Sequence, residues 1–111
     1  MLDLDRWDSK IPGWMNKKEG LWLYNEVLVL PEPATIVEIG CYRGKSTVAL
    51  LQGCADSSHD SKKVIVVDAF AGTGEKIEPA TKDQQSEGAA LFLKTLDEWG
   101  LRSWLRYLHI G

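Results

Sequence analysis

The sequence predicts an α/β fold with a parallel sheet. This prediction is based on two apolar runs and on the residues that follow each of them. Residues 36–39 form the first run, which breaks into a turn between Gly40 and Gly44 and then into a helix-compatible segment. Residues 64–67 form the second run, which is apolar at every position and ends in Asp68. Strand, tight loop, helix, strand and acid in this order are typical of half a nucleotide-binding α/β unit.

Turn-forming residues divide the rest of the chain into elements. Pro12 and Gly13 interrupt a helical N-terminal region, and Pro31 and Pro33 separate that region from the first strand. Gly100 ends the last helix in the position that glycine commonly takes after a helix. The expected elements are helices at 16–30, 45–54 and 83 or 86–99, and strands at 35–39, 64–67 and 103–110.

The expected strands form a partial parallel sheet in the order 3-2-1, with helices flanking it. An all-apolar strand such as residues 64–67 is typical of a parallel sheet whose two faces are both covered. The connection at 69–82 contains Gly72 and Gly74 and is long enough to indicate function or mobility.

Length, composition and charge limit the classes of function. A chain of 111 residues holds at most one domain, and its 44% hydrophobic and 26% charged residues are those of a globular protein. A net charge of −3 argues against nucleic acid or an anionic membrane as the main partner. No apolar run approaches the roughly 18 residues that span a bilayer, and the acidic N-terminus lacks the apolar region of a signal peptide. We therefore expect a cytoplasmic protein.

The cysteines and tryptophans are interpreted first as packing residues. Cys41 and Cys54 would be separated by several helical turns, too far for a disulfide, which favours a reducing compartment. No histidine lies near Cys41 in the sequence to support a nucleophilic role. The tryptophans are expected mainly to fill the core, with Trp7, Trp14 or Trp22 as an alternative cover over a cofactor.

Two known nucleotide-binding motifs resemble parts of the glycine loop, but spacing argues against both. Gly44-Lys45-Ser46 matches the end of a P-loop, which needs four residues before its Gly-Lys pair where Gly40 and Gly44 enclose three. A dinucleotide-binding loop needs a middle glycine to admit a pyrophosphate, and residues 41–43 offer none. A P-loop-like site and an NAD-type module stay as alternatives.

Residues 37–47, which read VEIGCYRGKST, resemble the first motif of class I S-adenosylmethionine-dependent methyltransferases. The likeness is greatest to the branch that contains catechol-type and macrocin-type O-methyltransferases. Residues 67–72, VDAFAG, are similar to the second motif of that branch, an acid followed by an aromatic residue and a glycine. The resemblance covers about residues 14–111 and implies S-adenosyl-L-methionine as the cofactor.

The resemblance implies a role for several residues of the two motifs. Glu38 would act toward the methionine amine, and the Ser46 hydroxyl with the helix N–H groups would receive the methionine carboxylate. Asp68 would accept the ribose hydroxyls, and Phe70 would pack near the adenosine. Cofactor contacts are therefore expected from Glu38, Gly40, Cys41, Tyr42, Arg43, Gly44, Ser46, Asp68, Ala69 and Phe70. No catalytic residue and no metal ligand is assigned.

The family's domain has a larger sheet than this sequence supplies. We therefore expect residues 1–34 to form an N-terminal helical segment and residues 35–111 a truncated Rossmann-like cofactor-binding domain, whose first strand is an exposed edge. The chain alone is expected to lack methyl-transfer activity, because His109 is the only candidate base at the carboxyl end of a strand. The expected partners are the small-molecule cofactor and either a second copy of the chain or a missing C-terminal half. A non-catalytic, self-associating half stays as an alternative.

Overall fold

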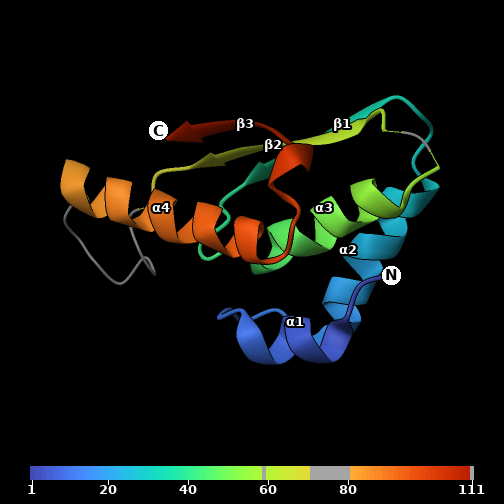
Figure 1. Ribbon diagram of the computed structural model, residues 1–111, viewed down its shortest axis with the longest axis horizontal. Helices are drawn as coiled ribbons and strands as arrows, with labels where there is room; N and C mark the ends of the chain where they lie inside the picture. The colour runs from blue at the N-terminus through green and yellow to red at the C-terminus, as the bar shows by residue number, and fades with distance from the viewer. Residues whose placement is uncertain (59, 71–80, 111) are drawn as a thin grey trace.

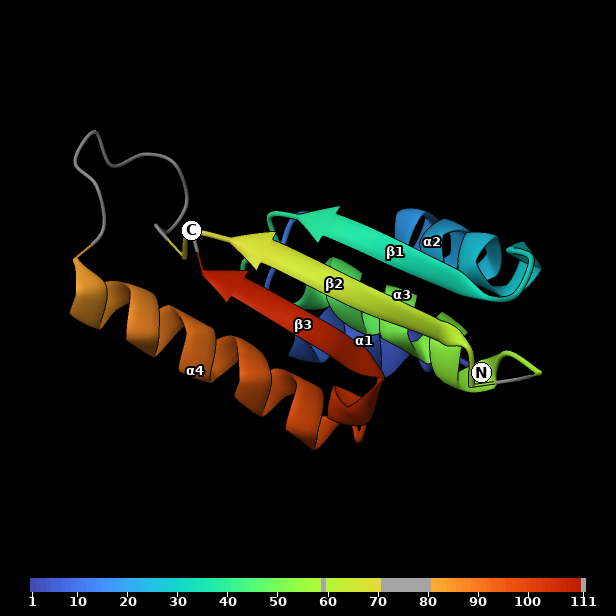
Figure 2. The ribbon, with the colours of Figure 1, turned by 90° about the horizontal axis from the view of Figure 1, so that it is seen from above.

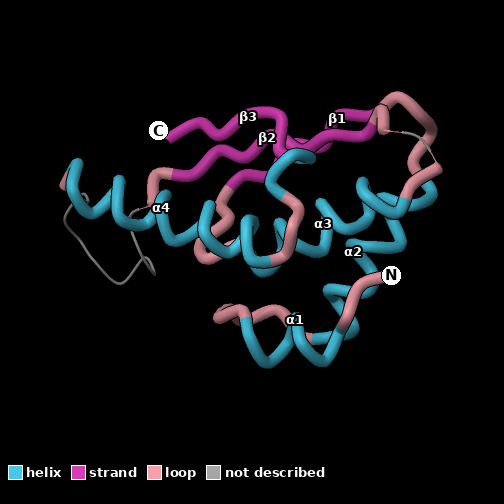
Figure 3. Tube along the Cα trace, viewed as in Figure 1, coloured by secondary structure: helices cyan, strands magenta, loops and turns pink. Residues whose placement is uncertain are grey.

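The computed structural model describes residues 1–58, 60–70 and 81–110, in which helices pack against one face of a sheet (Figure 1). Its elements in chain order are α1 (Leu4–Lys10), α2 (Lys17–Val29), β1 (Ala34–Ile39), α3 (Lys45–Asp56), β2 (Lys62–Asp68), α4 (Lys82–Glu98), the 3₁₀-helix η1 (Arg102–Trp104) and β3 (Leu105–Ile110). The strands lie together on one side of the molecule and the helices on the other (Figure 3). The predicted α/β class is confirmed.

The described strands pair in parallel in the order β1-β2-β3, which is the predicted order 3-2-1 read from the opposite edge (Figure 2). β2 is central, and its Ile65 pairs with Val37 of β1 and with Tyr107 of β3. Because the strands are parallel, their carboxyl ends meet at one end of the sheet and their amino ends at the other. The sheet is Rossmann-like in this sense, with β1 at an edge of its described part.

Only one face of the sheet is covered by helices within the described ranges. Val64 and Val66 of β2 are fully buried on the helix side, whereas Ile65 and Val67 point to the opposite face and are half-buried. On that open face, Ile39 of β1 is 84% exposed. The prediction that both faces are covered is therefore wrong for these residues. β2 is apolar on both sides because flanking strands shield even its uncovered side chains.

Local signals explain where the observed elements begin. The side chain of Thr81 accepts from the N–H of Gln84, whose side chain accepts from the N–H of Thr81, and this capping box starts α4. The third strand begins at Leu105 rather than at residue 103, because η1 precedes it. His59 and residues 71–80 of the predicted connection lie outside the described part of the chain.

Trp7 attaches α1 to the rest of the molecule. Its side chain is fully buried, and its indole N–H donates to the carbonyl of Lys45 at 2.7 Å. Gly20 of α2 permits this packing, since a Cβ there would lie 2.4 Å from the Trp7 ring. Trp7 is thus a core residue, as expected for most tryptophans, whereas Trp14 and Trp22 are exposed. The N-terminal segment consequently packs beside the start of α3.

Candidate functional site

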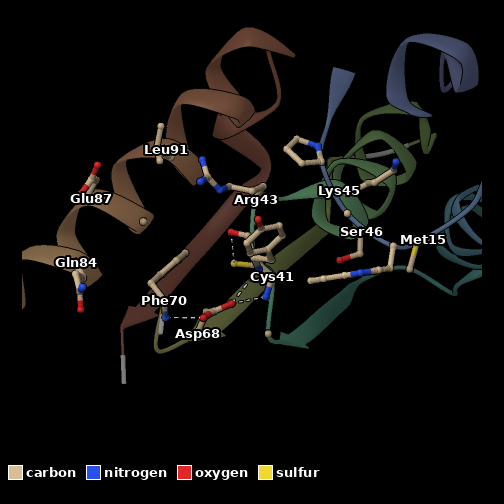
Figure 4. A pocket seen from close by; sticks show the side chains of 16 residues that line it. Met15, Cys41, Arg43, Lys45, Ser46, Asp68, Phe70, Gln84, Glu87 and Leu91 are labelled. Carbon is tan, nitrogen blue, oxygen red and sulfur yellow. Dashed lines mark hydrogen bonds between the residues drawn. The ribbon is translucent and has the colours of Figure 1, made fainter. Parts of the chain in front are cut away.

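A cavity of about 720 Å³ lies at the carboxyl end of the sheet, where β1 and β2 end (Figure 4). It is lined by residues 12–15 between α1 and α2, by residues of the loop and helix start at 40–46, and by one side of α4 at 84–91. Asp68 and Phe70, which end and follow β2, complete the wall. The volume is within the about 300–1,000 Å³ of small-molecule sites. The position is one where open parallel sheets bind ligands.

The loop after β1 turns sharply at two glycines. Gly40 has a φ of +83° and Gly44 a φ of +93°, both in the left-handed region that favours glycine. The N–H of Gly44 donates to the carbonyl of Cys41 at 2.8 Å, which closes a tight turn before α3. A Cβ at Gly44 would lie 3.2 Å from the ring of Phe92, so α4 also packs against this turn. The first turn of α3, whose N–H groups have no helical acceptor, borders the cavity at Ser46.

The Asp68 side chain accepts hydrogen bonds from the backbone of the glycine loop after β1 and from the backbone of the segment that follows β2. One carboxylate oxygen accepts from the N–H groups of Cys41 at 2.5 Å and Tyr42 at 3.1 Å. The other oxygen accepts from the N–H of Phe70 at 2.6 Å. Partial burial raises the pKa of this carboxyl, but the N–H donors outweigh burial, and the pKa lies below its ordinary value. The cavity wall therefore contains a carboxylate that is ionised at neutral pH.

Tyr42 and Phe70 both have left-handed backbones, with φ values of +47° and +52°. They are the only non-glycine residues with positive φ in the part of the chain that the structure describes, and both line the cavity. Each such conformation costs about 1–3 kcal/mol and is concentrated at functional sites. The Tyr42 ring lies 5.6 Å from the ring of Trp14, and the Phe70 ring lies 5.8 Å from that of Phe92.

Glu38 is bonded to α3 and is not part of the cavity wall. Its carboxylate accepts hydrogen bonds from the hydroxyls of Ser46 and Thr47 in the first turn of α3. Burial raises the pKa of Glu38 above its ordinary value, against the opposing effect of the two hydroxyl donors. Ser46 lines the cavity, but its hydroxyl donates to Glu38. These contacts fasten β1 to α3 and so hold the shape of the glycine loop.

Lys45 occupies the position of the phosphate-binding lysine in the P-loop alternative, but its ammonium group is bonded to α1. The side chain is buried, and Nζ donates to the carbonyl of Asp8 at 3.1 Å. Nζ also lies 3.6 Å from the Asp8 carboxylate and 4.8 Å from the centre of the Trp7 ring. Although Lys45 lines the cavity, its ammonium group is already engaged by Asp8 of α1, which competes with a phosphate at the loop. The geometry therefore does not favour a P-loop.

Some of the residues predicted from the two motifs line the cavity, and the others do not. Those in the cavity wall are Gly40, Cys41, Tyr42, Arg43, Ser46, Asp68 and Phe70. Glu38, Gly44 and Ala69 lie outside it. Burial raises the pKa of the Cys41 thiol, so this thiol is protonated at neutral pH and packs as a small side chain, as the sequence analysis expects.

His109, the candidate base, lies away from the cavity. It pairs with Val67 on the open face of the sheet, and its ring stacks on that of Tyr107 at 6.4 Å. No histidine lines the cavity within residues 1–58, 60–70 and 81–110. The described wall thus offers groups that bind and orient, and no imidazole that could move a proton.

Sequence reasoning missed two walls of the cavity. From the sequence we predict only a helix break at Pro12 and Gly13, and we assign the helix at 83 or 86–99 no contact with the cofactor. A weak signal existed in Gly88, since a glycine inside a helix often marks a close approach. A Cβ at Gly88 would lie 3.0 Å from the Cβ of Phe70, so α4 approaches this loop closely. Trp14, considered as a cover, does lie in the wall and is 79% exposed.

Comparisons with known proteins add no family assignment. A scan against protein-family models finds no match, and a search of curated proteins finds none. Among the helices of the described ranges, none combines the length and the apolar character needed to cross a bilayer. The functional proposal therefore depends on the geometry of the cavity and on the motif resemblance.

Proposed function

We propose that the cavity binds S-adenosyl-L-methionine or its demethylated product, S-adenosylhomocysteine, and that Asp68 is the main contact to the ribose. The observation that supports this most is the position of the Asp68 carboxylate in the cavity wall at the end of β2, where backbone N–H donors lower its pKa. A carboxylate has about four lone-pair sites, so the backbone donors leave acceptor capacity for a ligand. The neighbouring hydroxyls of a ribose suit such an acceptor.

The rest of the cavity is complementary to the two ends of this cofactor. The first turn of α3 is positively polarised and Arg43 carries a charge, and both suit the methionine carboxylate. Phe70 and Leu91 provide apolar surface for the adenine ring. A Cβ at Gly40 would meet nothing within 4 Å, so the space beside the loop is open. When bound, the cofactor supplies an electrophilic methyl group on a positively charged sulfur.

The proposed role of this chain is to bind and orient the cofactor. Asp68 accepts the ribose hydroxyls, Glu38 holds the loop by its bonds to α3, and residues 12–15 limit the access of water from one side. No histidine of residues 1–58, 60–70 and 81–110 lines the cavity, and in this proposal a second copy of the chain or another protein supplies the acceptor site. We propose the cytoplasm as its location, in line with the pair of free cysteines.

Calorimetric titration with S-adenosylhomocysteine, magnesium-ATP and NAD tests this proposal against its two alternatives. We expect saturable binding of S-adenosylhomocysteine with one site per chain, and no comparable binding of the other two ligands. Saturable ATP binding that requires magnesium, with none of the adenosyl ligand, would instead support a P-loop-like site. Binding of NAD alone would support a dinucleotide module.

A further inference from the structure

Asp68 is bonded to the backbone of both left-handed aromatic residues in the cavity wall. Neither bond is needed for a contact between this carboxylate and a ribose. We infer that Asp68 is also a positioning residue, which holds Tyr42 and Phe70 in their left-handed conformations and so sets the aromatic surfaces of the cavity. The inference deepens the proposed function and rests on it only for the choice of ligand.

One oxygen of the Asp68 carboxylate occupies an anion site that is formed by the glycine loop. The successive N–H groups of Cys41 and Tyr42 converge on one oxygen of Asp68. A backbone that places consecutive N–H groups in this way forms a concavity for an anion, and here the anion belongs to the chain itself. A bulky residue gains nothing locally from φ of +47°, so the charge-assisted bond to Asp68 offsets the unfavourable conformation of Tyr42.

The other oxygen of Asp68 closes a turn directly after β2. This oxygen accepts from the N–H of Phe70, two residues later, as aspartate does in an Asx-turn. Phe70 has further support, because its ring packs on Phe92 and its Cβ would lie 3.0 Å from a Cβ at Gly88 of α4. The left-handed conformation of Phe70 is therefore fixed from two directions.

Tyr42 lacks support of that kind. Its ring neighbours are Trp14, which is 79% exposed, and the guanidinium of Arg43 at 5.6 Å, which is half-buried. These ring contacts do not fix the Tyr42 backbone, which besides Asp68 is held by the bond from the Gly44 N–H to the Cys41 carbonyl that closes the turn. Loss of the Asp68 carboxylate should therefore release the Tyr42 side of the cavity first, together with the ring contact to Trp14.

Amide hydrogen exchange in the unliganded protein tests the inference without any ligand. In Asp68→Asn we expect the amides of Cys41 and Tyr42 to exchange about 10- to 100-fold faster than in the wild type, as when a bond to a charged group is lost. The amide of Phe70 should change less, because α4 still holds it. Asp97→Asn, a change at an exposed acid paired with Arg102, serves as the control and should leave these amides unchanged.

A double-mutant cycle measures whether Asp68 acts on the ligand through Tyr42. The affinity for S-adenosylhomocysteine is measured for Asp68→Asn, Tyr42→Ala and the double variant. If Asp68 positions Tyr42, the fold-losses will be less than multiplicative, since the second change removes a ring that is already displaced. A merely structural role would give multiplicative losses and would overturn this part of the inference.

Unchanged exchange at Cys41 and Tyr42 in Asp68→Asn would overturn the positioning role outright. If that variant does not fold, the wild type decides. Its Cys41 and Tyr42 amides should be protected although they lie in a loop, and rapid exchange there would contradict the inference. Failure of the wild type to bind S-adenosylhomocysteine would remove the proposed function, while the exchange data would still decide whether Asp68 positions Tyr42.

Discussion

The two ends of the sheet use buried charge in different ways. At the amino end, the buried ammonium of Lys62 donates to the carbonyls of Val27 and Leu28 at 2.8 and 3.2 Å and lies 3.8 Å from Glu32. It thereby provides a donor to two carbonyls in the last turn of α2, of which that of Val27 also accepts from the N–H of Leu30 at 3.2 Å. At the carboxyl end, Asp68 binds backbone N–H groups but still faces a cavity.

The two ends therefore differ in the role that we propose for their charged residues, which is stability at the amino end and ligand binding at the carboxyl end. Lys62 at the amino end is buried, whereas the carboxyl end combines an open cavity with two strained aromatic residues, Tyr42 and Phe70. Strain of this kind lowers stability and persists where surrounding contacts enforce it. Substitutions at the amino end should therefore change the free energy of unfolding, and those at the carboxyl end should change ligand affinity.

Lys62→Met should give the largest effect on stability. The methionine fills the volume but removes the donor to the Leu28 carbonyl and one of the two donors to the Val27 carbonyl, and Glu32 loses its buried counter-charge. We expect the free energy of unfolding to fall by about 2–4 kcal/mol, with affinity for S-adenosylhomocysteine unchanged in the folded fraction. Denaturant titration measures the first quantity and calorimetry the second.

Lys63→Met is the matched control for Lys62, because Lys63 is the next residue and its ammonium lies over the Trp104 ring at 4.5 Å. Only a cation–π contact is lost there, so we expect a cost of less than about 1 kcal/mol. Equal costs for the two lysines would show that the buried bonds to α2 contribute little.

Asp68→Ala should give the largest effect on binding. It removes the proposed acceptor for the ribose, and we expect affinity for S-adenosylhomocysteine to fall by about 1.5–3 kcal/mol, the range for losing a bond to a charged group. Asp97→Ala at an exposed position of α4 should leave affinity unchanged. The ribose assignment is wrong if the two variants bind equally well.

Glu38 and Asp68 should affect the pH dependence of stability with opposite signs. We expect these effects to be smaller than those of the substitutions above. The pKa of Glu38 is raised by burial, so the folded state holds its proton more tightly than the unfolded state. Its contribution to stability should decline as pH rises above about 4.3, the ordinary pKa of glutamate, until the folded pKa is passed. The pKa of Asp68 is lowered, so its contribution should be lost as pH falls below about 3.9 through the folded pKa.

Denaturant titrations of the wild type and Glu38→Gln across this pH range check the first sign. The variant cannot ionise at this position, so its stability should fall less steeply from pH 4.3 upward than that of the wild type. Identical slopes for both proteins would contradict the assignment of a raised pKa to Glu38.

The strands and the glycine loop could be predicted because short local patterns in the sequence indicate them. The apolar residues 64–67 and the pair Gly40 and Gly44 report backbone state directly. The remaining walls could not be predicted, since residues 12–15 and α4 reach the cavity only through packing of Trp7 and Phe70 with distant elements. The uncovered face of the sheet was also missed, because an apolar central strand looks the same with one face covered or two.

The central claim is that the carboxyl end of the sheet is a binding site for an adenosyl ligand and the amino end is not. Backbone amide resonances of the ¹⁵N-labelled protein, followed during titration with S-adenosylhomocysteine, test it most directly. We expect saturable shifts at residues 40–46, at Asp68 and Phe70 and along residues 84–91, with none at Ala34 or Lys62. Shifts confined to the amino end, or no saturable shift at the carboxyl end, would contradict the claim.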